Sequence, residues 1–156
     1  MRSAAADALG VQSPDLEADA QLAGALSDLS PLVRSHVIDA LGHRQAYAQA
    51  PKILDRFQAR DENLSVRLSA ARALGWLCHA NAVSALTDRA RTLKDPMLDA
   101  EQRSLAGVSL AALSRIHPNN LKDLLAPLLA DKGATPSIKR IAQTALDSKE
   151  HCSQLH

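Results

Sequence analysis

One pattern recurs along the chain and limits what it can fold into. In its three clearest copies a basic residue precedes a leucine–glycine pair, with alanines and other apolar residues at helical spacing in between. These copies cover residues 2–10, 33–42 and 66–75, and weaker copies cover residues 103–111 and 139–147. The basic residues 2, 34, 67, 103 and 139 are spaced by 32, 33, 36 and 36 positions. This period is typical of solenoids built from two-helix units.

Helix-capping residues support the same register. Four residues before each of the last four basic positions stands a side chain that can accept a hydrogen bond from the first turn of a helix. These residues are Ser30, Asn63, Asp99 and Thr135. Pro31 and Pro136 follow two of the caps, at the first helical position, where proline is tolerated. The sequence therefore predicts helices, called B helices here, near residues 2–10, 31–42, 64–78, 99–116 and 136–147.

A second set of helices, called A helices, is expected between the B helices. Apolar residues at helical spacing, such as Ile53, Leu54 and Phe57, place them near residues 16–28, 47–60, 81–94 and 119–130. Alternating β-branched runs bounded by turn dipeptides, which would indicate strands, do not occur in the sequence. We therefore predict an all-α fold of about four and a half helical hairpins. A single repeat domain is expected over residues 1–150, followed by a polar tail over residues 151–156.

The repeat resembles a known family. Residues 61–75 follow the pattern D-x-x-x-x-V-R-x-x-A-A-x-A-L-G nearly residue for residue, and residues 28–42 and 2–10 follow it well. This pattern is similar to the HEAT-like repeats of the phycocyanobilin-lyase type. The resemblance implies an armadillo-like right-handed α–α superhelix, but such a fold does not specify a function. It also implies that an aspartate and an arginine bridge neighbouring repeats, a structural role that would fall to Asp28, Asp61, Arg34 and Arg67.

Charge, hydropathy and cysteine usage narrow the class of partner. The 18 lysines and arginines balance 17 acidic residues, whereas a general nucleic-acid binder has a basic surplus. No apolar run is long enough to span a bilayer, and the first residues do not resemble a signal peptide. We expect Cys78 to be a buried free thiol and Cys152 an exposed thiol in the tail. Free thiols suit a reducing compartment, so a cytoplasmic location is expected unless a targeting segment precedes this sequence.

The sequence shows no catalytic constellation, so we expect no enzyme activity, no cofactor and no metal site. The HEAT-like deoxyhypusine hydroxylases bind iron through His-Glu pairs, and the sequence contains none. His36 and His43 are seven positions apart, about two helical turns, which is too far for one ion to bridge them directly. HEAT-like DNA glycosylases need a basic concave face with aromatic residues, and the neutral charge argues against one here. A bilin-lyase-type subunit remains an alternative by pattern.

The B helices are expected to carry the binding surface, because they line the concave side of such solenoids. Their core stripes are predicted to contain Val33, Val37, Ala40 and Leu41, and Val66, Ala70, Ala73 and Leu74. The opposite stripe is predicted to bind a partner and contains His36, Asp39, His43, Ser69, Arg72 and Trp76. Tryptophan and arginine are favoured as binding anchors. Packing of Trp76 in the core remains the alternative.

The N-terminal boundary suggests a larger protein. The first copy begins at Arg2, inside a B helix, without an A helix before it. We favour the interpretation that the chain is the C-terminal part of a longer repeat protein. A homodimer through the uncapped N-terminal face and poor order of residues 1–10 are the alternatives. The predicted function is a scaffold or adaptor module that binds a protein partner. A subunit of a bilin (tetrapyrrole) lyase-type enzyme and a nucleic-acid-associated HEAT-like protein are the alternatives.

Overall fold

The structure is a computed structural model that describes residues 15–132, 134–148 and 152. In these residues all regular secondary structure is helical, which confirms the predicted all-α fold. The chain divides into two compact units, Met1–Leu77 and Cys78–His156. The B helix predicted at residues 2–10, with the N-terminal face proposed for dimerisation, lies outside the described residues.

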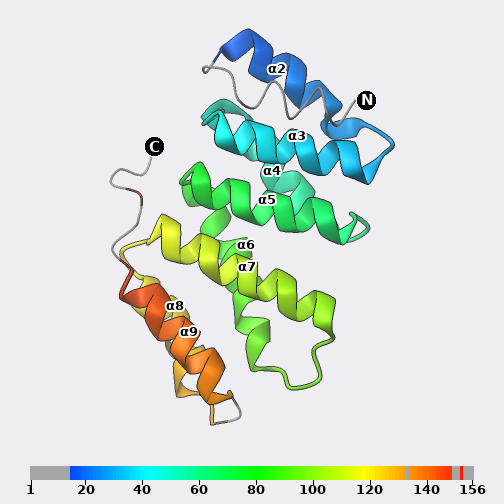
Figure 1. Cartoon of the computed structure of the whole chain (residues 1–156). Helices are drawn as coiled ribbons and strands as arrows, with labels where there is room; N and C mark the ends of the chain where they lie inside the picture. Colours follow the sequence, from blue (N-terminus) through cyan, green and yellow to red (C-terminus); the bar gives the residue numbers. More distant parts are fainter. Residues whose placement is uncertain (1–14, 133, 149–151, 153–156) are drawn as a thin grey trace. The chain divides into compact units, whose positions relative to one another are not determined.

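The first unit contains two helical hairpins in its described residues. Their elements are α2 (Leu16–Gly24) with the one-turn helix η1 (Ala25–Ser27), α3 (Pro31–His43), η2 (Tyr47–Gln49), α4 (Ala50–Gln58) and α5 (Leu64–Trp76). The second helix of each hairpin, α3 or α5, is a B helix. Figure 1 shows α3 and α5 side by side in one layer, and α4 packs against α5. The predicted binding residues therefore lie on two adjacent B helices, α3 and α5.

The second unit also contains two hairpins in its described residues. Its elements are η3 (Ala80–Ala82), α6 (Val83–Arg91), η4 (Thr92–Lys94), α7 (Ala100–Ile116), α8 (Leu121–Ala130) and α9 (Pro136–Leu146). The A helices α6 and α8 contact each other, the B helices α7 and α9 contact each other, and each A helix packs on its own B helix. Pro127 lies inside α8.

Three of the four predicted caps act through their side chains. Asn63 Oδ1 accepts the Ser65 N–H at 3.0 Å, Asp99 Oδ1 accepts the Gln102 N–H at 2.7 Å, and Thr135 Oγ1 accepts the Ile138 N–H at 3.4 Å. Ser30 occupies the N-cap of α3, where Asp28 Oδ1 accepts its N–H at 2.8 Å. The start of each described B helix is thus fixed by local polar chemistry that the sequence displays.

The core is made mainly of alanine and leucine side chains. All eight residues of the predicted core stripes on α3 and α5 are buried, at 6% exposure or less. Gly42 lies inside α3, where an added Cβ would be 3.2 Å from the Cα of Ala73 on α5. Gly42 therefore permits close approach of the two B helices α3 and α5.

Candidate functional site

The exposed side of α3 and α5, called the α3–α5 face here, carries five of the six predicted binding residues, His36, Asp39, His43, Arg72 and Trp76. His43 ends α3 and Trp76 ends α5. Their ring centroids are 4.5 Å apart, with 35° between the ring planes, a separation within the range of attractive ring contacts. His43 is exposed and Trp76 is half-buried. Trp76 is therefore neither a fully buried core residue nor a fully exposed one.

A polar cluster lies earlier on the same two helices. Asp39 Oδ2 accepts a hydrogen bond from the Ser69 hydroxyl at 2.9 Å. Arg72 Nη2 lies 3.3 and 3.4 Å from the two Asp39 oxygens and donates to Ser69 Oγ at 2.9 Å. These contacts use one nitrogen of a side chain that is 43% exposed. Asp39 from the neighbouring helix therefore holds the Arg72 side chain in place while much of that side chain stays exposed.

The predicted site residues Ser69 and His36 are not fully exposed. Ser69 was expected on the exposed stripe, but it is only 2% exposed. It lies where α3 and α5 pack together, so its hydroxyl orients Asp39 and Arg72 and is not presented to solvent. His36 lies half-buried on α3, one turn before Asp39. The structure thus assembles an aromatic pair and an anchored arginine from residues that are distant in the sequence.

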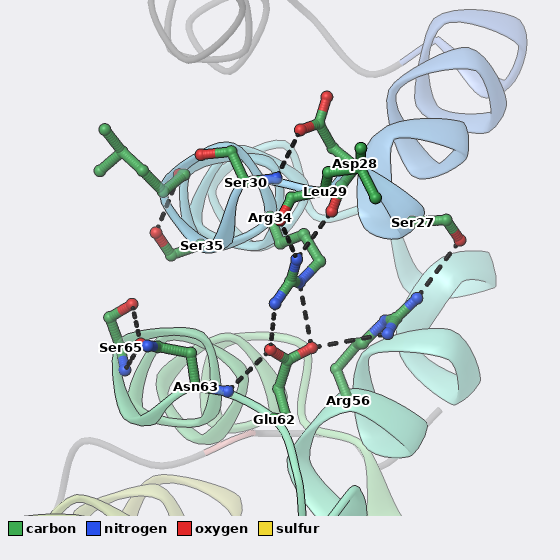
Figure 2. A network of polar contacts seen from close by, with 11 residues as sticks. Ser27, Asp28, Leu29, Ser30, Arg34, Ser35, Arg56, Glu62, Asn63 and Ser65 are labelled. Carbon is green, nitrogen blue, oxygen red and sulfur yellow. Dashed lines mark hydrogen bonds and ion pairs between the residues drawn. The ribbon is translucent and has the colours of Figure 1, made fainter.

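A second polar network joins the two hairpins of the first unit. Figure 2 shows Glu62, in the turn before α5, between Arg34 of α3 and Arg56 of α4. Arg34 donates from Nε and Nη2 to the two carboxylate oxygens of Glu62, and Arg56 Nη1 lies 3.5 Å from Oε2. Arg34 Nη1 also donates to the Asp28 carbonyl at 2.7 Å. A bidentate arginine–carboxylate contact of this kind is strong and directional, so it fixes the position of one hairpin against the other.

This network corrects one role implied by the family pattern. An Asp–Arg bridge between repeats was expected, and the acid that Arg34 contacts in the next repeat is Glu62, with Asp61 exposed beside it. Asp28 accepts the N–H of Ser30 through its side chain. Arg67 donates from Nε to the Phe57 carbonyl at 3.1 Å. Glu62 was missed because two acids adjoin in the sequence, and only the packing shows which one points toward α3.

The pKa of Glu62 gives a testable consequence. Burial on its own raises the pKa of this carboxyl, but the hydrogen bonds from Arg34 and the Asn63 N–H and the charges of Arg34 and Arg56 outweigh it and lower the pKa. Because this pKa is lower in the folded chain than in the unfolded chain, the ionised carboxyl stabilises the fold above the ordinary glutamate pKa of about 4.3. That stabilisation is lost as the pH falls through the pKa of Glu62 in the folded chain.

We expect Glu62→Gln to weaken the dependence of the free energy of unfolding on pH between about pH 5 and pH 3. Urea titrations at stepped pH measure this effect, and parallel curves for both proteins would contradict it.

A buried ion pair lies within the first hairpin. Arg44 follows the end of α3 and donates from Nε to Asp19 Oδ1 in the first turns of α2. The side chains are 0% and 4% exposed. Each charge also suits its helix end, because a helix N-terminus favours an anion and a C-terminus favours a cation. The sequence analysis did not identify this pair, since the two residues are 25 positions apart.

The cysteines differ from expectation. Cys78 and Cys152 were predicted to be separate free thiols, but they form a disulfide with their Cα atoms 5.9 Å apart. Both belong to the second unit and are separated by 74 positions. Sequence spacing alone does not indicate such a pairing, because it depends on where the chain returns after α9. Burial lowers the pKa of the neighbouring His79.

The described residues contain no group of three or more histidine, cysteine or acidic side chains placed to hold a metal ion. No helix among them combines the length and the apolar character needed to cross a membrane.

Comparison with known proteins agrees with the repeat register. None of the curated proteins compared matches the chain. The family model described as HEAT repeats matches residues 20–106, more than half of the chain. The matched region contains both helices of the α3–α5 face and the Arg34–Glu62 network that joins their repeats. The repeat pattern, the helical hairpins and this match together place the chain in the HEAT repeat family.

Proposed function

We propose that the chain is a scaffold or adaptor module that binds a protein partner through the α3–α5 face. The observation that carries the proposal is the His43–Trp76 ring pair on the same face as the anchored, accessible Arg72. Aromatic and arginine side chains dominate the energy of protein interfaces. A guanidinium group held by an acid on the neighbouring helix also loses little conformational entropy when it binds.

The chemistry of this face favours a protein over the alternatives. The face presents an aromatic pair and a single cation whose charge is partly balanced by Asp39. A nucleic-acid surface would instead carry a surplus of basic side chains toward phosphates. No arrangement in the described residues specifically favours a bilin-lyase-type subunit. The proposal is therefore restricted to protein binding.

Site-directed photo-crosslinking in the source cell tests the proposal directly. A photoreactive phenylalanine analogue would replace Arg72 in one variant and Lys52, an exposed residue of α4, in a control. We expect a discrete protein adduct at position 72, identifiable by mass spectrometry, and no corresponding adduct at position 52. Equal labelling at both positions would refute the proposed face. An adduct sensitive to nuclease at position 72 would favour the nucleic-acid alternative.

Substitution then separates binding from stability. Trp76 lies against Gly42, so its replacement would change stability as well as binding. His43 and Arg72 are exposed and give a cleaner test. We expect His43→Ala and Arg72→Ala each to weaken binding of the crosslinked partner by about fivefold or more, equivalent to about 1 kcal/mol at a binding anchor. Calorimetric titration measures the loss, with Lys52→Ala as the matched control. Unchanged affinity in both variants would exclude these residues as anchors.

A further inference from the structure

The disulfide encloses every described helix of the second unit. Cys78 is the first residue of that unit and Cys152 lies beyond α9. The covalent ring that they close therefore contains α6, α7, α8 and α9. The Cα separation of 5.9 Å is in the usual range for disulfides, so the fold accommodates the bond at ordinary backbone distances.

A hydrogen bond holds Cys152 from its other side. The Cys152 N–H donates to the Arg115 carbonyl at 2.9 Å, and Arg115 lies in the last turn of α7. The last four carbonyls of a helix lack partners within the helix. Cys152 therefore supplies a cap to α7 from a distant part of the chain. One residue beyond α9 is thus joined both to the end of α7 and to the residue that begins the unit.

The helix next to this bond has little core of its own. Among the described residues of α9 the buried side chains are the alanines Ala142 and Ala145, while Ile141 is 52% exposed. The partner helix α8 buries the larger Leu121, Leu125 and Leu128. Alanine removes little apolar area from water compared with leucine. Noncovalent packing therefore holds α9 less firmly than it holds α8.

We propose that Cys78–Cys152 is a redox-dependent clasp that fixes α9 against α7, and that the chain works in a compartment where protein disulfides persist. Both cysteines are partly exposed residues. This inference replaces the cytoplasmic location expected from two free thiols, because disulfides are rare in reducing compartments. It concerns the second unit and does not depend on binding at the α3–α5 face.

Closing the clasp needs an oxidant, and glutathione disulfide can serve by thiol–disulfide exchange. The Cys152 thiolate attacks one sulfur of glutathione disulfide and releases one glutathione thiolate. The Cys78 thiolate then attacks the Cys152 sulfur of the mixed disulfide and releases the second. Two electrons pass to glutathione disulfide, and the two protons lost by the cysteines are taken up by the glutathione thiolates. Excess dithiol reverses both steps.

Hydrogen–deuterium exchange of the intact chain, with and without dithiothreitol, tests the clasp. We expect reduction to accelerate exchange in peptides from α9 by about tenfold or more and to leave α3 and α5 unchanged, since opening would be local. A Cys78→Ser/Cys152→Ser variant should exchange like the reduced chain and should not respond to dithiothreitol. If α9 exchanges equally in the oxidised, reduced and double-serine proteins, the bond does not hold α9 and the clasp is refuted.

The chemical state of the two cysteines tests the proposed compartment. The chain is equilibrated in glutathione buffers, denatured and alkylated at its free thiols, and its mass is then measured by mass spectrometry. At a glutathione potential between about −180 and −210 mV, as in an oxidising compartment, we expect no alkylated cysteine. Two alkylated cysteines per chain at that potential would overturn the inference. The same assay on protein taken rapidly from its source cell should also find the disulfide, and two free thiols there would exclude the compartment.

Discussion

Replacing Arg44 with methionine is expected to destabilise the first unit by about 3–5 kcal/mol, because the change leaves a carboxylate buried without its cation. Asp19 is 3% exposed and accepts from Arg44 Nε. Methionine fills much of the arginine volume, so the loss reports the charge and not a cavity. The single tryptophan, Trp76, lies in the same unit as this pair. Its fluorescence in a urea titration therefore follows the unit that is affected.

Two controls show whether the loss of stability in Arg44→Met comes from the unpaired charge or from substitution as such. The Asp39–Arg72 pair has side chains 32% and 43% exposed, so Arg72→Met should cost no more than about 1 kcal/mol. Combining Asp19→Leu with Arg44→Met removes both charges and should recover much of the stability lost by Arg44→Met alone. A loss below about 1 kcal/mol for Arg44→Met would mean that water reaches Asp19 in the folded chain.

The contrast between this pair and the helix caps shows what the sequence reveals about the fold. Asn63, Asp99 and Thr135 each bind an N–H two or three residues ahead. Such contacts depend on local chain geometry, so residue type and register suffice to predict where α5, α7 and α9 begin. The core stripes follow for a similar reason, because a fixed helical period places their apolar residues on one face.

Contacts between distant residues could not be obtained in the same way. Arg34 pairs with Glu62 at a separation of 28 positions, and Cys78 pairs with Cys152 at a separation of 74. Both depend on how one hairpin packs on another, which a pattern within one helix does not encode. The α3–α5 face was predicted in outline, since it needs only the register of two B helices. The burial of Ser69 was not predicted, because it depends on how closely those helices approach.

The closeness of that approach leads to the second large expected effect. An ideal Cβ added at Gly42 would lie 2.8 Å from Trp76 Cε3, 3.1 Å from Ala73 Cβ and 3.2 Å from Ala73 Cα. The last of these contacts is to backbone, so a side-chain rotation alone cannot relieve the crowding. We expect Gly42→Leu to force α3 and α5 apart and to cost about 3 kcal/mol, at the upper end of typical overpacking penalties. Leucine favours helix over glycine, so helix propensity cannot account for such a loss.

Gly107 of α7 provides the matched control for this prediction. An added Cβ at Gly107 meets nothing within 4 Å. Gly107→Leu should therefore keep or raise stability, by up to about 1 kcal/mol from helix propensity. Gly42→Leu should also shift the Trp76 emission to longer wavelength, because the displaced ring becomes more exposed to water. If both variants unfold at the same urea concentration as the unmodified chain, and the emission is unchanged, the B helices of the first unit are not in close contact at Gly42. The binding proposed for the α3–α5 face would then lose the rigid support inferred for the Trp76 and His43 rings.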